Sequence, residues 1–573
     1  MKIRSALLSL VVGTLFLLPT GLCAESTGEY IITVKDGVTL SQSFLEAYDL
    51  TPITEEDHGL YLTDKANATR LAKHHKVEAV EKNATVTLSS YHYNDTYFDE
   101  QWAFDAINGS ELNHYSTVYR PNVVVIDTGF DFSHEDAGSN IFPGSDFVET
   151  PPGSSHIAKT TKDYFNHGTA VAGVIGAATD NNLGIAGLFR NCNIYVTSIF
   201  APNERGEAEG SNDAVCAAIY DAVDRYDADV ISMSFGDQSY STAMDQAIQY
   251  AYDHGVLLIA AAGNINAGNA DNVPNFPACL DGVISVANAN STTTIDSTSV
   301  YNEYVDVAAP GSAIYTLNAY TGAYSYFSGT SLATPHVTAL AAYAKALYPT
   351  LTPDDFEQYL RLTAQEMLTE GYDIHSGYGM IDCEKLHRYL SVRFRDVPLN
   401  EWYTTYIYEL ASNGTLIGSG NNCFYPENNI TRAEFVTILA RLNSVDLKKS
   451  YGIVPFYDVN QSHWHYNVIS WAYHAGLAFG NDDGSFAPDA PVTREELSAF
   501  LVRYMQTTEL SLPSAAALSF TDRNAVSAWA RDDVSILCQT GILHGFPDGS
   551  FRPQASATRS QAAKMIHLLQ KEL

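Results

Sequence analysis

The stretch Phe327–Ala339, which reads FSGTSLATPHVTA, decides both the fold and the chemistry of this chain. Gly329 and Thr330 predict a turn, and the Ala- and Leu-rich run at 332–347 predicts a helix that begins beside Ser331. A serine there can be a nucleophile, because free backbone N–H groups and the helix dipole stabilise a developing oxyanion. By itself the pattern is more often a simple helix cap, so the assignment depends on partners elsewhere in the chain.

A serine nucleophile needs a base, and the base needs a carboxylate that orients it. The β-branched run NVVVI at 122–126 predicts a buried parallel strand that ends at Asp127, and sites of open α/β sheets lie at such strand ends. In DYFNHGTAVAGVIGA, at 163–177, His167 begins a helix whose small residues permit close packing. These two segments therefore predict the partners of the serine, Asp127 and His167.

The chain order of these three residues, Asp127, His167 and Ser331, is the known subtilisin order. The blocks VVVIDTGF, NHGTAVAGVIGA and FSGTSLATPHV resemble the signature blocks of the subtilisin-like serine peptidases. The resemblance implies an α/β fold in which a parallel sheet is flanked by helices. A fourth block, VLLIAAAGN at 256–264, agrees with the family, and there the resemblance implies that the Asn264 side chain donates to the oxyanion.

The resemblance also implies a substrate site. The run VISMSFG at 230–236 predicts a strand that would bind substrate backbone as an added antiparallel strand, although a plain core strand gives the same pattern. Pro335 is expected in the first turn of the following helix, where a missing N–H costs little. The implied substrate-binding residues are Ser234, Phe235, Gly236, Ala261, Ala262 and Gly263.

The N-terminus predicts export from the cell. Residues 1–24 combine Lys2 and Arg4 with an apolar run and a small-residue cleavage site, which is typical of a secretion signal. Cys23 leaves a lipoprotein open, although the bulky Leu22 before it favours soluble export. No later apolar stretch is long enough to predict a transmembrane anchor.

Acidic side chains outnumber basic ones by 66 to 32, and the net charge is −34. This charge disfavours binding to the phosphate backbone of nucleic acids. It offers carboxylates for calcium, which prefers oxygen ligands. The resemblance implies that Asp95, Asp136 and Asn181 hold a structural calcium ion, although ordinary turn residues give the same pattern. It implies no organic cofactor.

A chain of 573 residues is too long for one core. Residues 29–36 and 77–88 predict strands, the first of them at a sheet edge, and residues 67–75 predict a short helix. Together they resemble a small α+β inhibitory and chaperone-like propeptide at 25–92, with an extension that has no inhibitory role as the alternative. The catalytic domain is expected at 93–390.

The remainder of the chain contains three copies of one pattern, each with a tryptophan, an aromatic-x-Pro turn and a Thr-Arg helix start. In each start the threonine caps the helix, and Glu or Gln three residues later completes a capping box, so the arginine is not needed for capping. The copies are mainly α-helical and resemble S-layer homology domains, which hold exported bacterial proteins on cell-wall polysaccharide. They are expected at 393–448, 455–510 and 519–573.

The arginines of these helix starts are Arg432, Arg494 and Arg559. The resemblance implies that they face grooves between copies, where a guanidinium suits a carboxylate-bearing sugar. A solvent-exposed arginine at a helix start is the alternative. The third copy departs from the pattern, because Gln561 replaces Glu and Arg523 replaces an apolar residue. Its groove is therefore expected to bind most weakly.

These patterns predict a secreted, cell-wall-anchored serine endopeptidase that hydrolyses polypeptide substrates through an acyl-enzyme. Ser331 would attack the scissile carbonyl, His167 would accept and return the proton, and Asp127 would orient the imidazole. Two alternatives remain: a surface-layer or adhesion protein whose peptidase-like domain is only a scaffold, and an esterase that uses the same three residues. The loops that build the specificity pocket leave the preferred substrate open.

Overall fold

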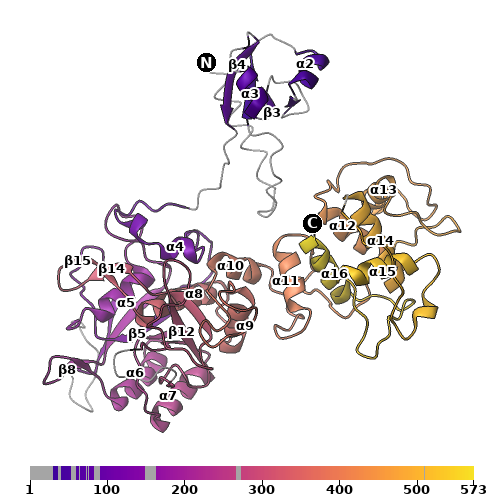
Figure 1. The fold of residues 1–573 in the computed structure, drawn as a ribbon. Coiled ribbons are helices and arrows are strands. Elements are labelled where there is room, and N and C mark those ends of the chain that lie inside the picture. The colour runs from indigo at the N-terminus through magenta and orange to yellow at the C-terminus, as the bar shows by residue number, and fades with distance from the viewer. Residues whose placement is uncertain are drawn as a thin grey trace. The chain divides into compact units, whose positions relative to one another are not determined.

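The computed structural model divides the chain into two compact units, residues 1–89 and 90–573 (Figure 1). The leader predicted at 1–24 lies outside the described residues. Within the part of the chain that is described, no helix combines the length and apolar character that a membrane crossing requires. The described residues are 30–35, 40–48, 50–52, 60–63, 65–71, 74, 76–82, 91–148, 163–265, 273–508 and 510–572.

The described residues of the first unit form a four-stranded antiparallel sheet, in the order β2-β3-β1-β4, with two helices. β1 pairs with both β3 and β4, so the prediction of an edge strand at 29–36 is wrong. The reason is that pairing partners are remote in sequence, and the strand pattern carries no sign of them. The elements are β1 (Tyr30–Val34), α2 (Gln42–Ala47), β2 (Thr51–Pro52), β3 (Leu60–Thr63), α3 (Lys65–Leu71) and β4 (Val77–Lys82).

The second unit is built on a seven-stranded parallel sheet in the order β13-β12-β11-β10-β5-β7-β6. Its strands are rich in Val, Ile and Ala, which is typical of strands buried on both faces. The predicted α/β fold with a parallel sheet is confirmed. The strands are β5 (Asn122–Asp127), β6 (Ile141–Asp146), β7 (Asn193–Ser198), β10 (Val230–Met233), β11 (Leu257–Ala261), β12 (Val283–Ala289) and β13 (Val307–Pro310).

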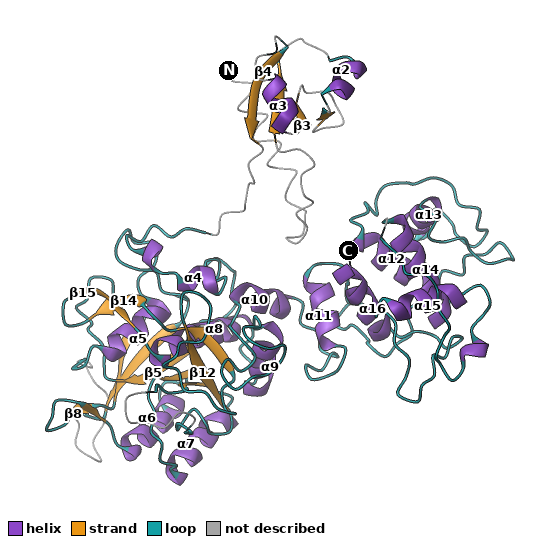
Figure 2. Cartoon of the chain, viewed as in Figure 1, coloured by secondary structure: helices purple, strands orange, loops and turns teal. Residues whose placement is uncertain are grey.

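Helices cover both faces of the sheet (Figure 2). Successive side chains of the central strands belong to two different hydrophobic cores, one on each face. Val123 and Val125 of β5 join the core formed with α5 and α8. Val124 and Ile126 join the core formed with α6 and α7. These helices are α5 (His167–Gly176), α6 (Asn212–Asp224), α7 (Thr242–Asp253) and α8 (Thr330–Leu347).

The strand order reverses between β5 and β10: β7 and β6 extend the sheet on one side, and β10 to β13 extend it on the other. Open α/β sheets bind ligands at such a point, outside the carboxyl ends of the strands. A hairpin, β14 (Ile314–Asn318) with β15 (Ala323–Phe327), leads into α8. The smaller elements of this domain are η1 (Phe98–Glu100), α4 (Ala103–Ala106), β8 (Ala201–Pro202), β9 (Ala208–Glu209), α9 (Pro353–Thr363) and α10 (Cys383–Ser391).

The three C-terminal repeats form a closed ring. The first helix of each repeat packs against the second helix of the preceding one: α13 against α12, α15 against α14, and α11 against α16. At the centre Ile430, Ala557 and Val492 donate their N–H groups in a cycle, each to the carbonyl oxygen of the next. The helices are α11 (Thr404–Ser412), α12 (Arg432–Leu442), α13 (Tyr466–His474), α14 (Arg494–Thr507), α15 (Arg531–Gln539) and α16 (Arg559–Glu572); a short turn, η2 (Arg523–Ala525), precedes α15.

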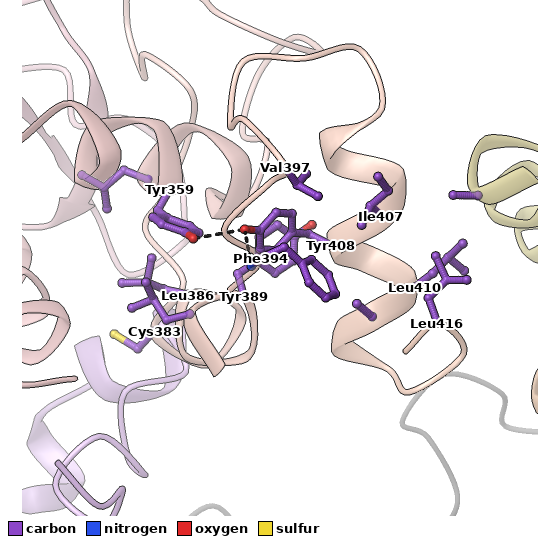
Figure 3. Close-up of a cluster of buried hydrophobic side chains, with 14 of the residues drawn as sticks. Tyr359, Cys383, Leu386, Tyr389, Phe394, Val397, Ile407, Tyr408, Leu410 and Leu416 are labelled. Atoms are coloured by element: carbon purple, nitrogen blue, oxygen red, sulfur yellow. Dashed lines mark hydrogen bonds between the residues drawn. The ribbon is translucent and has the colours of Figure 1, made fainter. Parts of the chain in front are cut away.

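The hydrophobic core continues from the sheet domain into the first repeat (Figure 3). The hydroxyls of Tyr359 in α9 and Tyr408 in α11 lie 3.2 Å apart, and the ring of Tyr389 in α10 stacks on Tyr408. The backbone N–H of Phe394 donates to the Tyr408 hydroxyl at 3.3 Å. The domain boundary expected near residue 390 therefore runs through packed side chains, not through a linker.

Candidate active site

Four side chains predicted from separate sequence blocks lie on elements at the carboxyl end of the parallel sheet: Asp127 bonds to His167, whereas Asn264 and Ser331 bond to backbone groups of Thr330 and Ser234. Asp127 is the last residue of β5, and His167 is the first residue of α5. Asn264 follows β11, and Ser331 lies in the first turn of α8. The fold thus gathers at its switch point residues that are far apart in the chain.

Asp127 and His167 form a close pair. The carboxylate is almost completely buried, and its Oδ1 accepts from His167 Nδ1 at 2.8 Å and from the Thr128 N–H at 2.7 Å. Its other oxygen, Oδ2, is a buried atom without a hydrogen-bond partner among the described residues. The contact to Nδ1 selects the tautomer that carries its proton there, which leaves Nε2 as a proton acceptor.

Two opposing effects set the pKa of His167. Burial is the largest, and it lowers the pKa because it favours the neutral ring. The charge and hydrogen bond of Asp127, with the charge of Asp163, outweigh burial and raise the pKa above its ordinary value. A base of this kind is active only when neutral, so hydrolysis at this site is expected to increase as the pH rises through that pKa.

Asp163 is a buried residue of the site that the sequence did not reveal. Its carboxylate accepts from the Thr128 hydroxyl at 2.8 Å and from three backbone N–H groups at 2.7 to 3.0 Å. The Thr128 hydroxyl in turn accepts from the N–H of Gly168, next to His167. Asp163 therefore fixes the start of α5. An acidic residue four positions before the helix was the available signal, but its partners include Thr128, which follows β5, as well as residues of its own segment.

Ser331 and Ser234 form a reciprocal pair. Ser331 Oγ donates to the carbonyl oxygen of Ser234 at 3.0 Å, and Ser234 Oγ donates to the carbonyl oxygen of Ser331 at 2.9 Å. Gly329 precedes the helix with a φ of 142°, a conformation that favours glycine. Because α8 begins at Thr330, Pro335 lies in its second turn, and the prediction that it occupies the first turn is wrong.

Asn264 is oriented by the helix that carries Ser331. Its Oδ1 accepts from the N–H of Thr330 at 3.0 Å. A Cβ atom at Gly329 would lie 3.3 Å from the same oxygen, so glycine permits this close approach. With Oδ1 engaged in this way, the amide Nδ2 is the end of the side chain left to donate to a bound oxyanion.

The two segments predicted to bind substrate lie on either side of one side chain, that of Asn275. A Cβ atom added at Gly236 would lie 2.1 Å from Asn275 Nδ2, and one at Gly263 would lie 3.2 Å from the same atom. Asn275 Nδ2 also donates to the carbonyl oxygen of Ala261 at 3.1 Å. No sequence pattern pointed to Asn275, because it does not lie in a motif. The predicted residues of these segments are Ser234, Phe235, Gly236, Ala261, Ala262 and Gly263.

The three residues predicted to hold calcium lie together. Asn181 Nδ2 donates to Asp136 Oδ1 at 2.7 Å, and the backbone N–H of Asn181 lies 3.4 Å from Asp95 Oδ1. Both carboxylates are buried, and neither forms an ion pair with Lys or Arg among the described residues. Burial, with a smaller contribution from the charge of Asp95, raises the pKa of Asp136 to about 6.

These residues fit a hard cation. Calcium takes carboxylate, amide and backbone oxygens, and a cation would remove the cost of burying two like charges. The described residues contain no group of three or more His, Cys, Asp or Glu side chains suited to a metal. Any ion held here would therefore need amide and backbone oxygens beside the two carboxylates.

The three repeat arginines lie between copies, and they are buried there instead of facing solvent. Each Nε donates at 2.8 Å to a carbonyl oxygen of the neighbouring repeat, those of Phe486, Phe551 and Phe424. Arg432 also pairs with Glu496 at 2.6 Å, and Arg559 pairs with Glu434 at 3.2 Å. Arg494 contacts the neutral Gln561 at 3.0 Å. These arginines therefore join the repeats into the ring.

Comparison with known proteins gives consistent findings. The subtilase family matches residues 120–379, and the S-layer homology domain matches residues 393–436, 455–498 and 519–563. The chain is 32% identical to a thermostable alkaline protease of Halalkalibacterium halodurans over 62% of this chain and 91% of that protein. It is 35% identical to subtilisin DY of Bacillus licheniformis over 46% of this chain and 89% of that protein. Among solved structures, a protease from Pseudoalteromonas arctica has a TM-score of 0.44 and 28% identity, over 52% of this chain and 98% of that chain.

Proposed function

This chain belongs to the subtilase family and is a serine endopeptidase, and from that premise we propose that Asp127, His167 and Ser331 form its catalytic triad. The observation that carries the proposal is the 2.8 Å contact between the buried Asp127 carboxylate and His167 Nδ1 at the switch point of the sheet. This contact leaves Nε2 available to take the proton of a serine hydroxyl.

The reaction begins when the Ser331 hydroxyl breaks its hydrogen bond to the carbonyl oxygen of Ser234 and donates a hydrogen bond to His167 Nε2 instead. Oγ then attacks the scissile carbonyl carbon while Nε2 takes its proton, and the imidazolium is stabilised by Asp127. The oxyanion is held by Asn264 Nδ2 and by the Ser331 N–H, one of the free N–H groups at the start of α8.

Collapse of this tetrahedral intermediate breaks the peptide bond. His167 Nε2 returns the proton to the leaving amine, which departs and leaves the acyl group on Ser331 Oγ. Water then attacks the acyl carbon, and Nε2 takes one proton from it. A second collapse releases the carboxylic acid and gives that proton back to Oγ, so the enzyme is unchanged after one turnover.

A fluorophosphonate probe tests the assignment of the nucleophile. The intact protein should be labelled on the peptide that contains Ser331, and Ser331→Ala should lose both the label and peptide hydrolysis. A matched control is Ser241→Ala, which removes a hydroxyl that caps α7. Labelling of the Ser331→Ala protein would place the nucleophile elsewhere.

The N-terminal segment acts as a removable propeptide in this proposal. Residues 25–92 contain the small sheet of the first unit, whose core is formed by residues such as Ile32, Tyr61 and Leu71. A segment with its own core can fold as a separate body and be cut away. The signal assigned to residues 1–24 directs secretion. If maturation is intramolecular, Ser331→Ala should keep the segment attached.

The S-layer homology repeats associate this endopeptidase with the cell surface. The grooves of the ring bind wall polysaccharide in this proposal. One groove of about 240 Å³ is lined by Glu434, Arg441, Arg559 and Trp464 among others. Trp464 is 66% exposed, which offers a flat face for a sugar ring, and the arginines suit an acidic substituent. Asp95, Asp136 and Asn181 hold a structural calcium ion in the same proposal.

A further inference from the structure

Helix α8 has a defect beside the proposed nucleophile. Pro335 lies inside the helix and has no backbone N–H. In a regular helix that N–H would donate to the carbonyl oxygen of the residue four positions earlier, which is Ser331. The peptide unit that follows the nucleophile therefore lacks its usual helical hydrogen bond.

The hydroxyl of Ser234 supplies a replacement. Ser234 directly follows β10, is 3% exposed, and donates from Oγ to the carbonyl oxygen of Ser331 at 2.9 Å. The donor thus comes from another element of the fold, and it joins the end of β10 to the start of α8. A second hydrogen bond between these two elements joins two side chains deeper in the core, from Thr338 Oγ1 to Ser232 Oγ at 2.9 Å.

The position of this carbonyl matters for catalysis. Ser331 contributes both its Oγ and its N–H to the proposed reaction, and rotation of its peptide units would move both groups together. A displacement of about 1 Å at a reacting group can cost on the order of 100-fold in rate. A buried acceptor without a donor would also favour local rearrangement of the helix start.

We propose that the Ser234 side chain is a positioning residue for the nucleophile, because its hydroxyl replaces the N–H that Pro335 lacks and so fixes the backbone of Ser331. The inference rests on the proposed function of Ser331. It concerns the Ser234 side chain alone, whereas the predicted contact with substrate uses the Ser234 backbone.

A double-mutant cycle tests the proposal. Ser234→Ala in the intact protein should lower kcat about 10- to 100-fold with KM changed less than about 3-fold, because the backbone that pairs with substrate is retained. Pro335→Ala restores an N–H to the helix. In that background Ser234→Ala should lower kcat by less than about 3-fold, so the two changes should be strongly non-additive.

Thr338→Val is the matched control. It removes a buried hydroxyl between the same two elements, about two turns further along α8 from Ser331. We expect it to lower the melting temperature and to leave kcat close to the value of its own background, both in the parental protein and in the Pro335→Ala variant. A purely structural role of Ser234 would make its variant behave like this control.

Each outcome decides the question. A parental kcat in Ser234→Ala, or an equal loss of kcat in both backgrounds, overturns the inference. If Ser234→Ala does not fold, the double variant should fold and turn over, and its failure would likewise overturn the inference. Failure of the proposed function gives a different result, because Ser331→Ala would then still hydrolyse peptides whatever the cycle shows.

Discussion

The active site and the repeat ring both bury charged side chains, but they use them in opposite ways. Asp127 leaves one carboxylate oxygen without a partner and directs the other at His167, whose side chain is 36% exposed. Arg432 directs its donors at a backbone carbonyl and at Glu496 of the next repeat. A buried charge that bonds to a partly exposed side chain can take part in catalysis. A buried charge that is hydrogen-bonded to several groups instead stabilises the fold.

The largest expected effect comes from neutralising the charge at the active site. Asp127→Asn should lower kcat/KM by roughly 10,000-fold, the loss typical of an orienting aspartate, because the tautomer and charge of His167 are no longer fixed. The melting temperature should change little, since the replacement has the same shape. A large loss of stability with modest loss of activity would show that Asp127, like Arg432, mainly stabilises the fold. The contrast between the two regions would then fail.

The junction between the two regions gives the next largest effect. Ending the chain after Leu390 would expose the faces of Tyr359 and Tyr389 that now pack on Tyr408. We expect the shortened enzyme to lose several degrees of melting temperature or to aggregate, because a core is cut open. Differential scanning fluorimetry on inactive Ser331→Ala backgrounds avoids self-digestion. An unchanged melting temperature would show that the two regions are independent modules.

The ring itself contains an internal control for charge pairing. Removing Arg432 leaves the half-buried Glu496 without its cationic partner, whereas removing Arg494 leaves the neutral Gln561. Arg432→Met should therefore cost about 3 kcal/mol in chemical denaturation of the repeats, and Arg494→Met about 1–2 kcal/mol. Wall pull-down should weaken in the same order if the arginines act by shaping the grooves. The reverse order in binding, with equal stabilities, would instead indicate direct contact with the sugar.

The proposed calcium site sharpens the comparison, because Asp136 is a buried carboxylate that forms no ion pair with Lys or Arg among the described residues. Its pKa is raised to about 6, so the metal-free fold loses stability as the pH rises through that value, and bound calcium removes the loss. EGTA should therefore lower the melting temperature more at about pH 7.5 than at about pH 5. Asp136→Asn should abolish this difference. An equal effect of EGTA on that variant would count against the site.

The smallest effect is expected at Asp163, whose carboxylate lies at the start of α5 and accepts hydrogen bonds from several groups there. Its charge contributes to the raised pKa of His167, so in Asp163→Asn the acidic limb of the kcat/KM profile should move to lower pH. Turnover should fall about 10-fold from the loosened helix start. Asp245→Asn, on the surface of α7, makes the same change in net charge and should leave the profile in place.

The residues of the proposed triad and oxyanion hole could be selected from the sequence because each lies in a short local pattern of strand, turn or helix. Asp127, His167, Asn264 and Ser331 each lie in a block of their own, and the combination of the four blocks led to the assignment. The roles of Asp163, the Ser234 hydroxyl and Asn275 depend on contacts between segments that are distant in the chain, so no local pattern carries them. The same holds for β1, whose two partners in the sheet were not visible in its own residues.

The repeats divide in the same way. Their spacing and capping boxes are local, and both boxes of the first two copies are present in the structure at Thr431 and Thr493. The partners of the three arginines are not local, because each guanidinium bonds to a different repeat. The resemblance implied an arginine that faces a groove. An arginine that joins two repeats by hydrogen bonds has the same sequence pattern, so the sequence could not distinguish the two roles.

Closure of the ring sets the number of copies. An open stack of repeats can gain or lose a member at its end, because each copy needs only its neighbours. Here α16 packs on α11, and Arg559 reaches back to Phe424, so the last copy is also the neighbour of the first. A fourth copy would have no place to insert without changing the angle between all the others. A circularly permuted gene that begins with the second copy should therefore encode the same ring.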